Sequence, residues 1–188
     1  MAIRTLFVDP SRCIGCRSCE AACRECDSHK GESMIMVDFL DRAESVATQP
    51  TVCMHCEEPL APCAQVCPVM AILVTPEGVV QQADTSRCIA CQNCVYACPF
   101  GVPKIDLAAK LMKKCNLCYD RTVRGLAPWC AQVCPTQALW YGDHEEFTQA
   151  RRGHAVRRTG FGTQEVRTRV FHVLPDGSAR LDVAALLE

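Results

Sequence analysis

The run Cys88-Ile-Ala-Cys91-Gln-Asn-Cys94-Val-Tyr-Ala-Cys98-Pro99 carries the strongest structural signal in this chain. Its spacing, C-x2-C-x2-C-x3-C-P, is one with which thiolates bind [4Fe–4S] clusters. The first three cysteines hold one cluster and the fourth binds a second one. The x3 step places Cys98 on a helical turn directed away from the loop, and the proline ends that turn. This run therefore predicts two clusters.

Three more groups of four cysteines accompany this run, and we number the four quartets in chain order. They are Cys13, Cys16, Cys19 and Cys23; Cys53, Cys56, Cys63 and Cys67; Cys88, Cys91, Cys94 and Cys98; and Cys115, Cys118, Cys130 and Cys134. The first quartet repeats the spacing of the third. Pro68, Pro99 and Pro135 follow the last cysteine of the other three quartets, whereas Arg24 follows the first.

The chain has 188 residues and 17 cysteines, far more than a globular domain normally carries. Disulfide frameworks of this density are usually shorter and secreted. Residues 1–10 lead into the first quartet without a basic segment and a long apolar run, so we expect no signal peptide and a cytoplasmic protein. Export in the folded state with a signal-bearing partner is the alternative. Repeated C-x2-C pairs in such a chain indicate metal binding.

Charge and hydropathy exclude two other classes of function. The net charge of -1 gives no electrostatic basis for nucleic-acid binding. No apolar run approaches the ~20 residues that span a bilayer, so a membrane role needs an anchored partner. Aromatic residues make up only 6% of the chain, and we expect clusters to fill volume that hydrocarbon would otherwise occupy. Folding should then depend on metal.

Zinc is the alternative metal, because paired C-x2-C motifs also build four-cysteine zinc sites. Such sites do not need a third cysteine at x2 or a trailing Cys-Pro. Two quartets here have three cysteines at successive x2 steps, and three quartets end in Cys-Pro. These features favour iron–sulfur clusters over zinc.

The order of the quartets suggests how they pair. The second and third are joined by a short predicted hairpin, so we expect them to form one two-cluster unit and the outer quartets to form another. The expected clusters are A (Cys13, Cys16, Cys19, Cys134), B (Cys53, Cys56, Cys63, Cys98), C (Cys88, Cys91, Cys94, Cys67) and D (Cys115, Cys118, Cys130, Cys23). The alternative is two units in tandem, first with second and third with fourth.

Hydrophobic patterning predicts an α+β protein with short elements between the quartets. We expect strands at 4–9, 34–40, 71–75, 79–82, 104–107, 110–112, 138–141 and 166–174. A helical turn is expected at 20–22, a helix at 144–151 after the N-cap Asp143, and a last helical turn at 183–187. Residues 41–49 are polar and are expected to be a connection.

The quartet order resembles a known family when it is combined with Lys114-Cys115-Asn-Leu-Cys118-Tyr-Asp120-Arg121 and the stretch from Gly125 through Cys130 to Ala138. It is similar to the four-cluster electron-transfer subunits of the dimethyl sulfoxide reductase and formate dehydrogenase type. Related subunits serve carbon monoxide dehydrogenase, certain hydrogenases and tungsten aldehyde oxidoreductases. The resemblance covers about residues 3–142 and implies the nested pairing. The sequence departs from it in the six residues between Cys56 and Cys63 and in the region after residue 142.

The resulting expectation is two interleaved bacterial ferredoxin-like units that carry four [4Fe–4S] clusters and perform no catalysis. The four-cluster domain spans 1–142, with an inner unit at 53–98 and an outer unit formed by 1–30 and 110–142. Residues 143–188 are expected to be a basic extension that docks a partner. The resemblance implies a molybdenum- or tungsten-pterin catalytic subunit and a second redox partner, such as a redox subunit, ferredoxin, flavoprotein or quinone-linked protein; self-association stays open. The alternatives are a free polyferredoxin carrier and a zinc-bearing module.

Three features outside the ligand set carry separate expectations. Cys26 is the seventeenth cysteine; the x3 spacing favours Cys23 as the ligand, and Cys26 is expected to be an inert packed thiol. His55 lies between two ligands and is expected to face solvent, although a hydrogen bond to a cluster is the functional alternative. The C-terminal arginines are expected to form a solvated basic face; they are Arg151, Arg152, Arg157, Arg158, Arg167 and Arg169.

Overall fold

The computed structural model describes residues 4–41, 46–151, 153–175 and 177–183. Its strands are β1 Thr5–Val8, β2 Met36–Asp41, β3 Val46–Thr51, β4 Cys56–Glu58, β5 Ile72–Val74, β6 Val80–Ala83, β7 Lys104–Asp106, β8 Leu111–Lys113, β9 Leu139–Gly142, β10 His154–Phe161, β11 Gln164–Leu174 and β12 Leu181–Asp182. Its helices are η1 Pro10–Arg12, α1 Ser18–Cys23, η2 Asp27–His29, α2 Pro62–Gln65, α3 Asn93–Tyr96, α4 Tyr119–Thr122, α5 Trp129–Gln132 and α6 His144–Ala150. Short helices and strands are mixed throughout, as an α+β protein requires.

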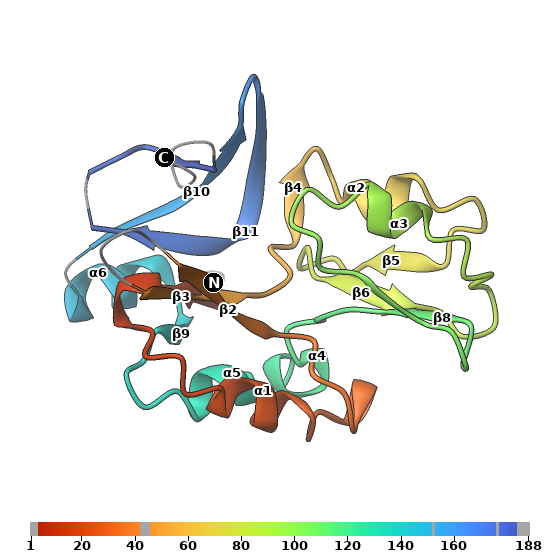
Figure 1. Ribbon diagram of the computed structural model, residues 1–188, viewed down its shortest axis with the longest axis horizontal. Helices are drawn as coiled ribbons and strands as arrows, with labels where there is room; N and C mark the ends of the chain where they lie inside the picture. Colours follow the sequence, from red (N-terminus) through yellow and green to blue (C-terminus); the bar gives the residue numbers. More distant parts are fainter. Residues whose placement is uncertain (1–3, 42–45, 152, 176, 184–188) are drawn as a thin grey trace.

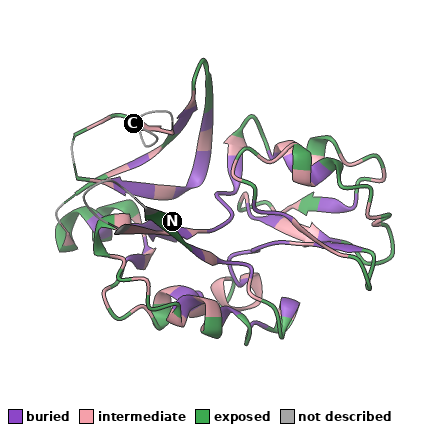
Figure 2. Cartoon of the chain, viewed as in Figure 1, coloured by how far each residue is buried: buried purple, intermediate pink, exposed green. Residues whose placement is uncertain are grey.

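A mixed six-stranded sheet joins segments that are far apart in the sequence (Figure 1). Its order is β12-β10-β11-β1-β9, and β4 also pairs with β11. β11 runs parallel to β1 and antiparallel to β10 and β4. Most of its length is buried (Figure 2). Residues 143–188, expected to be an extension, therefore contribute strands to the same sheet as the N-terminal strand.

The short helices pack in two pairs. α1 packs against α5, so the first and fourth quartets lie together, and α2 packs against α3, so the second and third lie together. Figure 1 shows α1 and α5 below the large sheet, and α2 and α3 beside the hairpin of β5 and β6. Segments from the two ends of the cysteine-rich region thus meet in space, while the middle segments pack with each other.

The hydrophobic core divides into three clusters of side chains. One combines Leu6, Val8, Leu139 and Val170 with cysteines of the first, second and fourth quartets. A second surrounds Cys63 and Cys94. The third is an aromatic group without cysteine, in which Phe7 stacks on Phe147 and Phe171 at centroid distances of 4.5 and 4.6 Å. Thiols therefore occupy core positions in two of the three clusters.

Most expected elements are present, and one expectation is wrong. The helix at 144–151 begins as expected at Asp143, which forms a capping box with Glu146. Residues 46–49, expected to belong to the polar connection 41–49, instead form most of β3, which pairs with β2. Residues 42–45 and 184–188 lie outside the described part, so the last helical turn cannot be compared beyond Val183. No helix in the described part is long and apolar enough to cross a membrane.

Candidate metal centres

The first and third quartets form the same loop. Gly15 and Ala90 precede the second cysteine with φ of 68° and 53°, and Arg17 and Gln92 follow it with φ of 57° and 67°. Positive φ at both positions curls the chain tightly and lets the three thiols of each loop share one side. Gly15 is also sterically constrained, because a Cβ there would lie 3.0 Å from Cγ2 of Thr48.

The second, third and fourth quartets end in Cys-Pro, and the same type of turn follows each of them. In each, the third residue after the cysteine has positive φ and donates its N–H to the carbonyl oxygen of that cysteine. The bonds run from Met70 to Cys67, from Gly101 to Cys98 and from Gln137 to Cys134, at 3.1, 3.2 and 3.1 Å. Proline fits the first position because its φ is fixed and no N–H is needed there. The chain then leaves the cluster loop for the next segment.

Three cavities are each lined by four cysteines. The thiols that line them are Cys13, Cys16, Cys19 and Cys134; Cys53, Cys56, Cys63 and Cys98; and Cys67, Cys88, Cys91 and Cys94. The space around these thiols, including the solvent at each mouth, measures about 300, 340 and 310 Å³. In each case three cysteines come from one quartet and the fourth comes from its spatial partner. The structure thus brings together the residues expected for clusters A, B and C.

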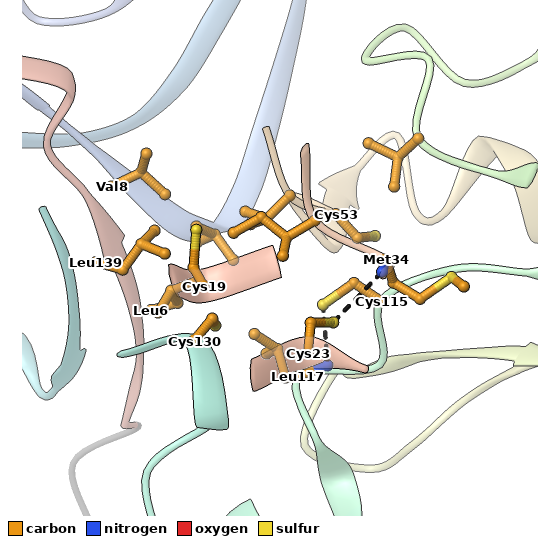
Figure 3. Close-up of a cluster of buried hydrophobic side chains, with 14 of the residues drawn as sticks. Leu6, Val8, Cys19, Cys23, Met34, Cys53, Cys115, Leu117, Cys130 and Leu139 are labelled. Atoms are coloured by element: carbon orange, nitrogen blue, oxygen red, sulfur yellow. Dashed lines mark hydrogen bonds between the residues drawn. The ribbon is translucent and has the colours of Figure 1, made fainter. Parts of the chain in front are cut away.

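Three of the four cysteines of the fourth quartet are buried. Cys115, Cys118 and Cys130 are buried, and so is Cys23 of the first quartet. The charges of Cys115 and Cys23 both act on Cys130, whose pKa burial raises well above its ordinary value. Figure 3 shows Cys23, Cys115 and Cys130 among the side chains of the same core cluster. The residues expected for cluster D therefore also lie near one another.

Burial makes free thiolates costly at these positions. Burial raises the pKa of Cys19 to about 12, and the nearby thiols Cys134 and Cys13 add to the effect. Burial likewise raises the pKa of Cys56 to about 12, with Cys53 adding to it. Several buried sulfurs in one place can be anionic together only if bound cations neutralise them. The donor sets therefore fit a metal group ligated by four thiolates.

Backbone amides donate to several of these sulfurs. Met34 N–H donates to Cys23 Sγ at 3.3 Å, and Leu117 N–H donates to Cys115 Sγ at 3.4 Å, as drawn in Figure 3. Ala71 N–H donates to Cys67 Sγ at 3.3 Å. Hydrogen bonds to ligand sulfur stabilise the extra negative charge of a reduced iron–sulfur cluster. These loops can therefore hold clusters and also adjust their potentials.

The zinc alternative requires thiolates that converge on one ion, with Zn–S distances near about 2.3 Å. In the parts of the chain that the structure describes, no three Cys, His, Asp or Glu side chains form a group that could hold a single metal ion. Metal analysis of the purified protein distinguishes zinc from iron directly.

His55 is fully buried, so the expectation that it faces solvent is wrong. Its Nδ1 accepts a hydrogen bond from Val80 N–H at 3.0 Å, which places the ring proton on Nε2. Burial, with the charges of Lys114 and Arg169, lowers the pKa of His55 well below its usual value. The sequence did not indicate this because the burial depends on strands β6 and β11, which are distant in the chain.

The C-terminal arginines do not form a solvated basic face. Arg157 pairs with Glu57, and Arg167 Nη1 lies 3.2 Å from Glu58 Oε1. Arg169 is buried and donates to the carbonyl oxygen of Glu77. The remaining described members also have partners: Arg158 pairs with Glu165, and Arg151 donates to Gln137, while Arg152 lies outside the described residues. The carboxylates of Glu57, Glu58 and Glu165 thus pair with three of the arginines that a docking face would need.

Comparison with known proteins agrees with the donor sets. Residues 44–144 match the 4Fe-4S dicluster domain, and residues 6–25 match a 4Fe-4S binding domain. The chain is 40% identical to the thiosulfate reductase electron transfer subunit PhsB of Salmonella typhi, over 73% of this chain and 74% of that protein. It is 34% identical to a subunit of the sulfite dehydrogenase of Allochromatium vinosum, over 95% and 85%. It is 31% identical to the formate dehydrogenase iron-sulfur subunit of Wolinella succinogenes, over 85% and 90%.

Proposed function

Because the chain belongs to the family of [4Fe–4S] electron-transfer subunits of oxidoreductase complexes, we propose that it relays electrons through four such clusters between a catalytic subunit and a redox partner. The chain itself is a non-catalytic subunit. The clusters supply one-electron redox chemistry, and the protein supplies ligands, burial and spacing. The observation that carries the proposal is the set of three cavities with four cysteines each.

The proposed ligand sets are the nested ones, A to D as defined above. The packing of α1 on α5 and of α2 on α3 supports this wiring over two tandem units. It also supports two interleaved ferredoxin-like units, an inner one at 53–98 and an outer one formed by 1–30 and 110–142.

The clusters are proposed to form a linear path in the order A, D, B, C. Electrostatic influence between cysteines of different sites supports each step. The charge of Cys19 acts on Cys130 (A to D), that of Cys53 on Cys115 (D to B), and that of Cys94 on Cys63 (B to C).

Exposure is consistent with this order. Cys16 in cluster A and Cys91 in cluster C are the exposed ligands, whereas every ligand of D is buried. Electrons would therefore enter at A or C and leave at the other, with B and D as internal relays. Large apolar side chains are exposed close to both ends, with exposed fractions of 66% for Ile14 and 60% for Ile89.

Exposed apolar side chains beside both terminal clusters favour a subunit of a complex over a free carrier, since such residues commonly mark protein interfaces. The proposed catalytic partner is of the molybdenum- or tungsten-pterin type, where a two-electron reaction delivers electrons singly to the relay. A free polyferredoxin is the second candidate. Co-purification separates the two: a stable complex supports the subunit, and a chain that exchanges electrons alone with a soluble donor supports the carrier.

Metal analysis and a crossed substitution test the clusters and their wiring. Anaerobically purified protein should contain about 16 iron atoms, four for each of four [4Fe–4S] clusters. Cys98→Ser should alter the EPR signal of the cluster that Cys56→Ser also alters, although Cys98 belongs to the third quartet. A Cys98→Ser protein that alters only the signal affected by Cys91→Ser contradicts the wiring. A colourless, zinc-loaded protein contradicts the function as a whole.

A further inference from the structure

Lys114 is a fully buried lysine between two cluster sites. Its exposed fraction is 0%, and it directly precedes Cys115 of cluster D. Its ammonium group lies 3.5 Å from Cys53 Sγ of cluster B and donates to the carbonyl oxygens of Val80 and Cys115 at 2.5 and 3.0 Å. One cation therefore contacts ligand residues of both internal clusters.

The adjacent lysine shows what is missing around Lys114. Lys113 is partly exposed and pairs with Glu32 and Asp106 at 3.1 and 2.8 Å. Lys114 has no carboxylate partner in the part of the chain that the structure describes, and its acceptors are two carbonyls and one cysteine sulfur. A buried ammonium without a counter-charge is strongly destabilising. Its negative partner must then be the thiolate-ligated group at Cys53.

Val80 fixes the ammonium in this position. The Val80 carbonyl accepts from Lys114, and the Val80 N–H donates to Nδ1 of His55. His55 lies between Cys53 and Cys56 of cluster B, and Lys114 precedes Cys115 of cluster D, so Val80 bonds to residues next to ligands of both clusters. Because Val80 itself lies in strand β6 and is 1% exposed, the hydrogen bonds are shielded from water. The cation is therefore held rigidly.

From these contacts we infer that Lys114 is the fixed counter-charge of cluster B and raises its reduction potential relative to the other three clusters. Reduction adds one negative charge to a [4Fe–4S] cluster, so a fixed cation beside a ligand sulfur stabilises the reduced form. The attraction is strong because little water screens it. Lys114 acts through Cys53 and is a positioning residue that makes cluster B hold the electron at the junction of the two units. This inference rests on the proposed four-cluster wiring.

A redox titration followed by EPR tests it on the full chain, purified anaerobically with its clusters. Lys114→Met keeps the length and apolar stem of the side chain but removes the charge. We expect the population of reduced cluster B to fall at least tenfold relative to the other clusters at a given potential, which is 59 mV for a one-electron couple. The cluster B signal is identified by its change in Cys56→Ser.

Lys113→Met is the matched control, because it removes a lysine one residue away whose charge is already neutralised by Glu32 and Asp106. It should leave all four midpoints within the error of the titration. Lys114→Arg keeps the charge and should keep cluster B more reducible than Lys114→Met does. A Lys114→Met protein with four clusters and unshifted midpoints, or with four equal shifts, overturns the inference and leaves the electron-transfer function intact.

Failure to load clusters is also informative. If Lys114→Met lacks cluster B, the comparison is repeated with Lys114→Gln. Loss of cluster B in both neutral variants, with retention in Lys114→Arg, supports a counter-charge. Loss in all three shows that side-chain shape matters instead of charge and overturns the inference. Fewer than four clusters in the unsubstituted protein contradicts the wiring itself and is read from the iron content before any variant is compared.

Discussion

Cys26 lies beside the proposed site of cluster D but lacks the spacing of the proposed ligands. It is completely buried, as a packed thiol should be, and its Sγ lies 3.2 Å from Ser28 Oγ. Cys118 is also a neighbour of Cys26, and it is the largest of the influences that hold the pKa of Cys26 below its usual range. Cys23 contacts the same site and accepts from Met34 N–H. Two cysteines thus lie close enough to complete this cluster.

We predict that Cys26→Ser keeps all four clusters, because Cys23 occupies the x3 position and already receives a backbone hydrogen bond. Cys23→Ser should remove cluster D or convert it to a three-iron form. Iron content and the EPR spectrum of the oxidised protein measure both effects. The reverse pattern, with loss of iron in Cys26→Ser and none in Cys23→Ser, would make Cys26 the ligand.

His172 makes the fold sensitive to acid. It lies in β11 opposite Val8, is 6% exposed, and its Nε2 has no hydrogen-bond partner in the structure. Burial lowers the pKa of His172 to about 4. Because this folded pKa is below the ordinary 6.5, the folded state binds fewer protons than the unfolded state. The stability present above pH 6.5 is therefore lost as the pH falls from 6.5 to about 4.

We predict that His172→Gln flattens this pH dependence. At about pH 5 the unsubstituted protein should lose roughly 2 kcal/mol more than the variant, relative to neutral pH. Thermal loss of the visible cluster absorbance measures the effect at each pH. His154→Gln is the control, because the side chain of His154 is exposed, and it should keep the original slope. Equal slopes in all three proteins would exclude His172 as the cause.

The residues found from sequence are those whose role is encoded in local spacing. C-x2-C steps and Cys-Pro ends identify candidate ligands without any tertiary information. The burial of Lys114 and His55 could not be predicted from sequence. It depends on packing against strands such as β6 and β11, which local sequence does not reveal. In sequence, a buried lysine before a cysteine looks the same as a surface lysine, as the adjacent and partly exposed Lys113 illustrates.

At the level of elements, two departures from the family pattern explain each other. The six residues between Cys56 and Cys63 include most of β4, which pairs with β11. Glu57 and Glu58 on β4 pair with Arg157 and Arg167 of the C-terminal hairpin. The longer spacing supplies an edge strand and two carboxylates, and the C-terminal strands supply the partners for both.

We predict that Glu57→Gln destabilises the protein by about 1 kcal/mol, because it leaves Arg157 and Arg167 without their shared carboxylate. Glu58→Gln should cost less, since the Glu58 side chain is 69% exposed. Thermal midpoints at low and high salt check the order, and the difference should shrink with salt. Equal midpoints in both variants at low salt would show that the carboxylate pair does not hold β4 to the hairpin.

β3 shows why one element was missed. Its sequence, Val-Ala-Thr-Gln-Pro-Thr, is polar and contains Pro50, which argues against a central strand. β3 pairs with β2 and has no partner on its other edge among the described residues. An edge strand can accommodate a proline, so Pro50 does not prevent this pairing. Its threonines also make specific bonds: Thr51 donates to Asp38, and Thr48 donates to the carbonyl oxygen of Cys13. Such partners are defined only in the folded chain.

At the scale of the whole molecule, cluster ligands and hydrocarbon side chains share one core. Five cysteines belong to the largest buried group, whereas the aromatic group around Phe7 contains none. Removing metal should therefore affect the two parts differently. The cluster loops lose their fixed geometry, while the aromatic side of the large sheet keeps its packing.

We predict that anaerobic chelation of iron abolishes hydrogen-exchange protection in the loops of all four quartets and leaves part of the protection in β10 and β11. Exchange measured by mass spectrometry before and after chelation checks this. A chain reconstituted with iron and sulfide should regain protection in the loops. Uniform protection after complete removal of iron would show that the fold does not depend on its clusters.

The position of β11 also constrains the order of assembly in the cell. A ribosome makes β1 first and β11 only after all seventeen cysteines. Yet β11 lies directly between β1 and β10 and also pairs with β4, which begins at the proposed ligand Cys56. Until this late strand has been made, β4 has no strand to pair with in the large sheet. The large sheet is therefore completed only after every candidate ligand has been synthesised.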